Sequence, residues 1–446
     1  MSLKQGKTRR MLHARPHPPR WPKGAPTVAV LPLLDLRPQG VGTYLTEGLA
    51  EEIIQDLNRL EGLRVLSRTT TFPYAGSELA LSDIGRRLQA DAILVGSLVD
   101  REDGPTLEAD LIHPASGRTL WSRTCRFDRL DLFTILDDVT RHVAEALGAT
   151  AEAHPRHAVD LKAYEAYLKG RQAYFQFNRQ AMEQAARSYR QALDIDPRYA
   201  AAWSGLANCA AYAYIYLDRT EDQRERAESF SRKALELDPD LAEAHASRGV
   251  ALSAAGLAEE AEEAFEAALC LDPNLYEAAY FYARHCFSAG KPERAIEYFE
   301  WAAALRPEDF QAVLLVAQVY HSLGVEDEAE RARRQGLALV EQRLARVPGD
   351  ARARYLGANA LVALGSRDQG LAWARMARDL DPDDPMLLYN LGCIHALAGE
   401  PEEALDCLEQ AVAGGLSQKG WLQHDGDLDA IRPHARFQAL MATLGD

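Results

Sequence analysis

The chain has 446 residues, of which 47% are hydrophobic and 26% are charged, a composition typical of a folded protein. The formal net charge is −16, and residues 1–26 hold seven basic and no acidic residues, so the rest of the chain carries −23. A body this acidic repels nucleic-acid phosphates and anionic lipids, which argues against specific nucleic-acid binding.

Residues 1–26 combine those seven basic residues with five prolines, which predicts a disordered basic arm. The N-terminus lacks the apolar core of a secretion signal, and no apolar run approaches the roughly 18 residues that span a bilayer. We therefore expect no membrane insertion and a cytoplasmic location. A periplasmic or membrane-anchored location is the alternative if an upstream segment has been removed.

Residues 27–148 alternate short apolar runs with helical patterns, which predicts an α/β sandwich with a mixed sheet. The expected strands are residues 27–36, 63–67, 91–99, 106–112 and 119–127. The expected helices are residues 45–60, 82–90 and 131–147. Asp103-Gly104 and Ser116-Gly117 are turn signals that predict hairpins between the last three strands.

Five stretches of this region resemble the TolB-like amino-terminal domain that precedes tetratricopeptide repeats in many bacterial signalling proteins. The stretches are Val28–Pro32, Leu45–Glu52, Leu63–Thr69, Asp91–Ser97 and Ala115–Trp121. The resemblance implies a domain without a catalytic motif. In that family the domain and its repeats commonly follow a cyclase, kinase or DNA-binding domain.

The sequence offers little for enzyme chemistry. Gly40 and Gly42 lie between a strand and a helix, as in a dinucleotide fingerprint, but Leu45 replaces the third glycine, so we expect a loop. The six cysteines form no C-x-x-C pair, and those in the second half occupy positions of small residues, which favours buried free thiols. We therefore expect no cofactor, no metal and no catalytic residue.

After a linker expected at residues 149–160, the chain is repetitive. Successive prolines lie 34 residues apart at Pro239, Pro273 and Pro307, and again at Pro348 and Pro382. Such a period predicts a helical hairpin stacked on copies of itself. Residues 161–416 accordingly resemble about seven tetratricopeptide repeats, which implies an all-α superhelix.

Two intervals between prolines are longer than 34 residues. The interval from Pro197 to Pro239 is 42 residues, and we expect the eight extra residues as a longer turn within 212–226. The interval from Pro307 to Pro348 is 41, and we expect its seven extra residues as continued helix over 336–347. Seven residues are almost two helical turns, so the buried stripe keeps its phase.

Residues 417–446 are expected to form a C-terminal capping helix, because the open end of a stack needs a cover. Its apolar face would comprise Trp421, Phe437, Leu440 and Leu444.

By comparison with the repeat family, seven residues are expected to face the concave groove and bind a partner. They are Asn208, Tyr280, Arg284, Gln318, Tyr355, Asn359 and Tyr389. This strip offers amide hydrogen bonds and aromatic contacts to an extended peptide, and Arg284 alone would serve an acidic group. The alternative is that the tyrosines pack between repeats.

These patterns favour a non-enzymatic scaffold that binds a protein or peptide partner in the concave groove. The alternative is the detached regulatory half of a bacterial signalling protein of the cyclase or transcription-regulator type, with a small-ligand-binding N-terminal domain. The identity of the partner and the oligomeric state do not follow from the sequence.

Overall fold

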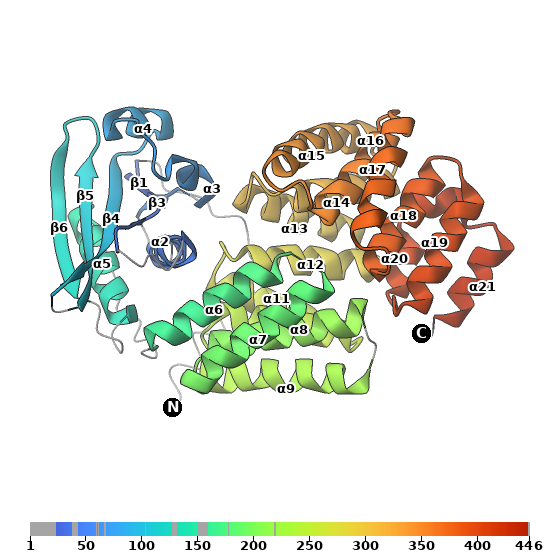
Figure 1. Ribbon diagram of the computed structural model, residues 1–446, viewed down its shortest axis with the longest axis horizontal. Helices are drawn as coiled ribbons and strands as arrows, with labels where there is room; N and C mark the ends of the chain where they lie inside the picture. The colour runs from blue at the N-terminus through green and yellow to red at the C-terminus, as the bar shows by residue number, and fades with distance from the viewer. Residues whose placement is uncertain are drawn as a thin grey trace.

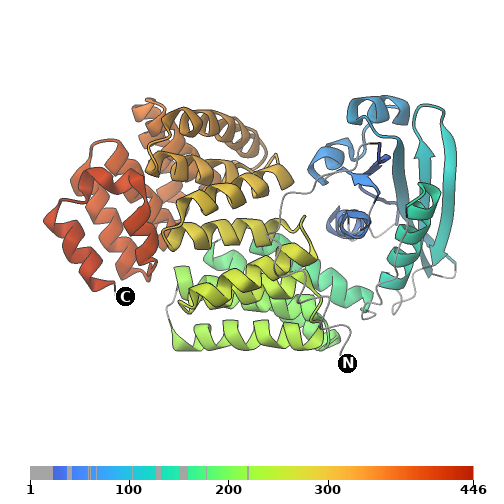
Figure 2. The same ribbon diagram turned by 180° about the vertical axis from the view of Figure 1, so that it is seen from behind.

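The computed structural model describes residues 24–37, 43–58, 60, 62–66, 68–102, 104–126, 132–149, 159–176, 178–217 and 220–444. An N-terminal α/β domain precedes a curved array of paired helices (Figures 1 and 2). The predicted basic arm at 1–26 and the predicted linker at 149–160 lie almost wholly outside the described residues, so both stay predictions.

The N-terminal domain is built on a mixed sheet, as predicted. Its strands are β1 (Thr27–Val30), β2 (Leu34–Asp35), β3 (Arg64–Val65), β4 (Ala92–Arg101), β5 (Gly104–His113) and β6 (Arg118–Arg126). The order is β3-β1-β4-β5-β6, with β3, β1 and β4 parallel and β4, β5 and β6 antiparallel, while β2 pairs with β4. The strand predicted over 27–36 is interrupted at Pro32, which has no N–H to donate to a ladder.

Helices cover both faces of this sheet. They are α2 (Thr43–Asn58), α3 (Arg68–Thr71), the 3₁₀ helix η1 (Phe72–Tyr74), α4 (Leu81–Leu88) and α5 (Leu132–Ala146). The main core is apolar and includes Leu49 and Ile53 of α2 and Leu136 of α5. On the other face, Ile84 of α4 packs with Ala29 and Ile93.

The second half of the chain is a stack of seven helical hairpins, which confirms the predicted superhelix. The first helices of the hairpins are α6 (Leu161–Tyr174), α8 (Ala200–Tyr216), α10 (Ala242–Ala254), α12 (Tyr276–Ser288), α14 (Phe310–Ser322), α16 (Ala351–Ala363) and α18 (Pro385–Leu397). The second helices are α7 (Arg179–Ile195), α9 (Glu221–Leu237), α11 (Ala258–Leu271), α13 (Pro292–Leu305), α15 (Glu326–Arg346), α17 (Arg367–Leu380) and α19 (Pro401–Ala413).

One hairpin illustrates how the repeat ends its helices. Gly256 follows α10 with φ of +78°, a left-handed conformation that glycine adopts without steric cost and that ends the helix. Pro273 follows α11, because proline cannot continue a helix.

The two insertions differ from each other. Helix α15 has 21 residues, which confirms that the seven extra residues continue the helix. The longer turn expected within 212–226 is wrong, because α8 and α9 each extend to 17 residues and leave only residues 217–220 between them. Extension of α8 keeps Tyr212 and Tyr216 in helical phase, and both are buried.

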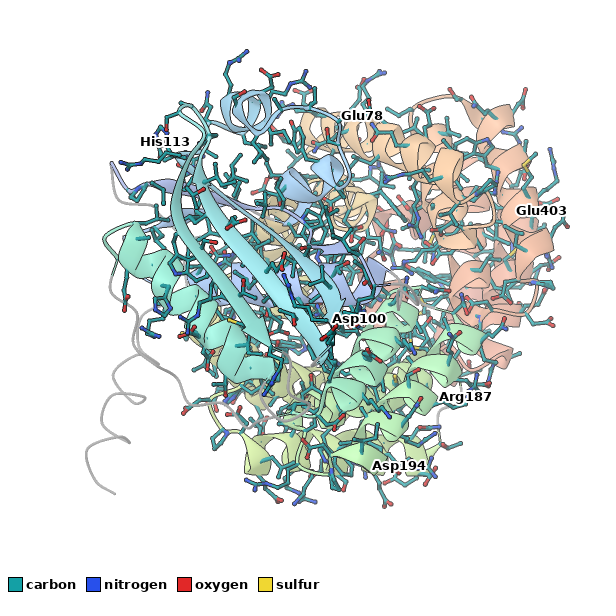
Figure 3. The ribbon with its side chains drawn as sticks, turned by 60° about the vertical axis from the view of Figure 1, so that its left-hand side comes forward. Glu78, Asp100, His113, Arg187, Asp194 and Glu403 are labelled. Carbon is teal, nitrogen blue, oxygen red and sulfur yellow. The ribbon has the colours of Figure 1, made fainter. Side chains whose placement is uncertain are left out.

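The outer surface of the molecule is polar. Charged residues such as Asp100, Arg187 and Glu403 are exposed and point outward (Figure 3). None of the helices within the described ranges is both long and apolar enough to cross a bilayer.

The α/β domain is joined to the repeats by a network of charged side chains. Glu51 of α2 lies 3.2 Å from Arg171 of α6 and 2.8 Å from Arg68 of α3. Arg171 also lies 3.5 Å from Glu277 of α12, and Glu277 lies 3.1 Å from Arg306, which follows α13. The network therefore ties the α/β domain to the first and fourth hairpins at once.

Glu51 is the buried centre of this network. Its burial by itself would raise the pKa of the carboxyl group, but the positive charges of Arg171, Arg68 and Arg306 outweigh burial and lower the pKa to about 2. A lowered pKa means that the ionised carboxylate stabilises the folded chain above about pH 4, and that this stabilisation is lost as the pH falls toward 2.

We predict that Glu51→Gln lowers the free energy of unfolding by about 3 kcal/mol at pH 7, because it removes the buried carboxylate that Arg171 and Arg68 share. Glu47→Gln is the matched control on the same helix, since Glu47 is 35% exposed and pairs only with Arg68 among the described ion pairs. It should cost less than about 1 kcal/mol. Urea denaturation followed by circular dichroism measures both, and equal losses would contradict this account.

Candidate functional site

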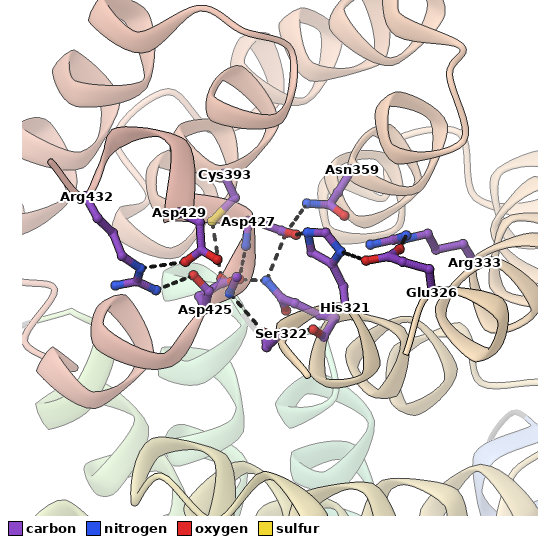
Figure 4. A network of polar contacts seen from close by, with 12 residues as sticks. His321, Ser322, Glu326, Arg333, Asn359, Cys393, Asp425, Asp427, Asp429 and Arg432 are labelled. Carbon is purple, nitrogen blue, oxygen red and sulfur yellow. Dashed lines mark hydrogen bonds and ion pairs between the residues drawn. The ribbon is translucent and has the colours of Figure 1, made fainter. Parts of the chain in front are cut away.

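The inner, concave face of the superhelix is the candidate site, and part of the chain itself lies along it. We call residues 417–431 the C-terminal segment. It contains α20 (Lys419–His424) and the 3₁₀ helix η2 (Gly426–Ile431), which contact α12, α14 and α18. Figure 4 shows the polar contacts around Asp425 and Asp427 of this segment. After it, α21 (Ala435–Thr443) returns to pack on α19.

This course corrects the single capping helix that was predicted for 417–446. Phe437, Leu440 and Leu444 are buried at the end of the chain, where α21 packs on the last hairpin. Trp421 instead lies three hairpins away, with its ring centroid 4.8 Å from that of Phe287 on α12. An apolar pattern specifies that a face is buried but not which surface buries it, so the pattern alone could not place Trp421.

Arg284 of α12 forms the first contact between the segment and the concave face. Its guanidinium carbon lies 4.8 Å from the ring centroid of Trp421, a cation–π distance. The same guanidinium donates hydrogen bonds to the hydroxyl groups of Tyr280, at 3.3 Å, and Tyr216. Arg284 is thus held by side chains of the concave face, which we call the wall, and contacts an aromatic ring of the segment.

A second arginine, Arg352 of α16, connects side chains of neighbouring helices beside this contact. It donates to the Tyr280 hydroxyl at 3.1 Å, to the Tyr355 hydroxyl at 2.7 Å and to Gln311 Oε1 at 2.5 Å. Sequence reasoning missed Arg352, because it lies at the start of its helix, outside the positions that the repeat family assigns to the groove.

Two carboxylates of the segment contact side chains of α14, α16 and α18. Asp425 Oδ2 accepts hydrogen bonds from Gln318 Nε2, at 2.6 Å, and from the Tyr389 hydroxyl. Asp427 Oδ2 accepts from Asn359 Nδ2 at 2.8 Å and from Gln318 Nε2 at 3.2 Å. Both aspartates are at least 98% buried, so neutral donors of three different hairpins replace water around two acidic groups.

The environment of Asp425 favours its protonated form. Burial raises the pKa of this carboxyl group to about 7, and the neighbouring charge of Asp427 adds to the rise, against the opposing hydrogen bond from Tyr389. Burial also raises the pKa of Asp427, while Asn359, His321 and Arg333 oppose the rise. His321 Nε2 lies 3.8 Å from Asp427 Oδ1, and Arg333 faces the pair from α15.

Cys393, Asp425 and Asp427 also place potential metal-ligand atoms within 4.8 Å of one another. However, Cys393 Sγ lies 3.5 Å from Asp425 Oδ2, where a thiol donates, and burial raises the pKa of the Cys393 thiol well above its ordinary value. Gln318 and Tyr389 also donate hydrogen bonds to Asp425 Oδ2, so this oxygen already has partners within the protein.

The structure divides the seven predicted groove residues into three sets. Gln318, Asn359 and Tyr389 meet at the two aspartates. Tyr280, Arg284 and Tyr355 meet in the arginine cluster. Asn208 of α8 takes part in neither hydrogen-bonded set, and its Oδ1 is buried without a described hydrogen-bond partner.

The groove continues beyond the segment as a cavity between α8, α10 and α12, next to Gln418. Aromatic rings dominate its lining, with Tyr174, Tyr212, Tyr216 and Phe281 around Arg284. The three predicted tyrosines, Tyr280, Tyr355 and Tyr389, are themselves at most 4% exposed, and each hydroxyl is hydrogen-bonded within the protein. They shape the wall and present hydroxyl groups, whereas most of each ring is packed.

Comparisons with known proteins agree with this architecture in the second half of the chain. A family model described as anaphase-promoting complex, cyclosome, subunit 3 matches residues 254–335, and a tetratricopeptide repeat model matches residues 355–418. The C-terminal part of the chain consists of tetratricopeptide repeats.

One curated protein, a putative adenylate cyclase 3 from Rhizobium meliloti (strain 1021), is 31% identical over 246 residues. The match covers 53% of this chain and 41% of that protein, so the chain spans about two fifths of the relative's length.

Solved structures of repeat proteins are similar at low identity. A tetratricopeptide repeat protein from Parabacteroides merdae gives a TM-score of 0.36 at 16% identity, covering 62% of this chain and 98% of its own. The anaphase-promoting complex hetero-tetramer Cut9–Hcn1 gives 0.41 at 15% identity, covering 70% and 53%. These likenesses are too distant to bear on function.

Binding of the segment should depend on pH. Because the pKa of Asp425 is raised when it is buried, protonation stabilises the bound segment, and this stabilisation is lost as the pH rises from about 4 through about 7. We predict that the opening equilibrium of residues 419–431, measured by amide hydrogen exchange, increases roughly fourfold between pH 6.5 and pH 8 after correction for intrinsic exchange.

Two variants of the same segment serve as comparison. Asp425→Asn should abolish this pH dependence, whereas Asp429→Asn should retain it, since the Asp429 side chain is 72% exposed. The range stops at pH 6.5 because burial lowers the pKa of His424, whose protonation at lower pH has the opposite effect. A pH-independent opening equilibrium in the unmodified chain would show that Asp425 does not titrate near neutrality.

Proposed function

We propose that the chain is a non-enzymatic scaffold that binds a protein or peptide partner along the concave face of its repeats. The observation that supports this proposal is the C-terminal segment, which side chains of the wall contact along the concave face. Gln318, Asn359 and Tyr389 direct hydrogen-bond donors into the groove, and Arg284 makes a cation–π contact with an aromatic ring.

The cavity beside Gln418 continues the surface on which such a partner would lie. Its tyrosine and phenylalanine rings suit aromatic and apolar side chains, which dominate the centres of protein interfaces. We expect this binding to take place in the cytoplasm. The N-terminal domain, held to the repeats through Glu51 and Arg171, provides a second surface in a fixed orientation.

A photo-activated cross-linking residue tests the proposal in cells. Placed at Ile215, which lines the cavity, it should capture a partner, whereas at Arg334, which is exposed on α15, it should not. Mass spectrometry of the adducts identifies the partner. Adducts that form at Arg334 and not at Ile215 would move the binding site to the outer face and contradict the proposal.

A second candidate is the regulatory half of a nucleotide-cyclase system. In this case the N-terminal domain, which resembles the TolB-like domain, would bind a small ligand. The 31% identity to a protein named as a putative adenylate cyclase supports it. The same cross-linking experiment separates the two candidates, because a captured cyclase catalytic domain would favour regulation and an unrelated partner would favour a general scaffold.

A further inference from the structure

The C-terminal segment approaches α12 and α14 so closely that two of its glycines leave no room for a side chain. A Cβ atom on Gly420 would lie 2.1 Å from the carbonyl oxygen of Ser288, and one on Gly426 would lie 2.9 Å from the Cα of Ser322. Both obstacles are backbone atoms, which cannot move aside as the end of a flexible side chain can. The segment therefore packs closely against the ends of α12 and α14 at these two positions.

Three side chains of the segment that contact the wall lie at a fixed spacing, beside the buried Leu422 and Leu428. Trp421 contacts both Arg284 and Phe287 of α12, and Asp425 and Asp427 follow it by four and six residues. The wall offers these carboxylates hydrogen-bond donors from amide, hydroxyl and thiol groups, and an apolar side chain at either position would leave those donors unpaired. The chemistry thus selects an aromatic residue followed by two acidic residues.

A short connection tethers the segment to the repeats. Residues Gly414 to Gln418 connect α19 to α20, and Gly415 has φ of +112°, so a short turn delivers the segment to the groove. Such a tether raises the effective concentration of the segment to the millimolar range. A free ligand of the same chemistry must compete against that concentration.

We propose that residues 418–427 are a built-in competitor for the partner site, and that the partner presents an aromatic residue followed four and six residues later by carboxylates. This inference rests on the proposed function, and it names the partner's chemistry and the regulation of the same groove. The partner's peptide displaces the segment from α12, α14 and α18 and takes over its contacts.

A fluorescent peptide with the sequence of residues 416–432 tests the inference on the full chain by anisotropy. Gly420→Ala weakens the tethered competitor, so the peptide should bind this variant on the order of tenfold more tightly than the unmodified chain. Gly349→Ala is the matched control, because a Cβ at Gly349 meets no atom within 4 Å, and its affinity should be unchanged. Replacing Trp421, or Asp425 together with Asp427, by Ala in the peptide should weaken binding at least tenfold.

The inference would be overturned if the peptide bound the unmodified and Gly420→Ala chains with equal affinity. It would also be overturned if the peptides with replaced side chains bound as tightly as the original peptide. If Gly420→Ala does not fold, the unmodified chain is tested instead. Excess unlabelled peptide should then raise the rate of amide exchange of residues 419–431. An unchanged exchange rate would also overturn the inference. Cross-links from Ile215 to a partner without peptide binding would refute this inference and leave the proposed function standing. Peptide binding without any cross-link at Ile215 would support recognition of the segment but refute the proposed function, and with it the partner that this inference names.

Discussion

The burial of two acidic side chains in the concave face is the constraint on which the candidate site depends. Asp425 and Asp427 connect helices of three hairpins, because Gln318, Asn359 and Tyr389 all donate to them. Each repeat of a solenoid normally contacts only its neighbours. A segment that crosses from α12 to α18 therefore adds long-range contacts that fix the curvature of the wall.

The same constraint makes these contacts reversible. Burying a carboxylate costs free energy that hydrogen bonds from neutral donors only partly offset. The pKa of Asp425 near 7 expresses that cost, since the buried group takes up a proton at a pH where an exposed aspartate does not. An apolar cap would have no such dependence, so the polar contact is better suited to exchange with a ligand than to permanent closure.

The repeat array could be predicted from sequence because its signals are local. Glycine after a first helix and proline after a second helix each act through their own backbone, and the 34-residue period aligned the hairpins. The α/β domain was predictable for the same reason. The insertion in the second hairpin was placed wrongly, because its residues suit helix as well as loop, and packing of Tyr212 and Tyr216 decides between them.

The candidate site was predictable only in part. Gln318, Asn359 and Tyr389 were found by their positions in the repeat, but their acidic partners lie 36 to 109 residues away in sequence, and no local pattern specifies that pairing. Arg352 was missed, and Trp421 was assigned to a cap. Interactions between distant segments depend on how all the hairpins stack. The sequence pattern predicts each hairpin but not the contacts between segments far apart in the chain.

The position of Trp421 in solution tests the central claim most directly. In protein with selectively protonated Trp and Phe rings, a nuclear Overhauser effect should connect Trp421 with Phe287, whose ring centroids lie 4.8 Å apart, and Phe287→Leu should remove it. Cross-peaks from Trp421 to Phe437 in place of Phe287 would put the indole at the end of the stack and contradict the account.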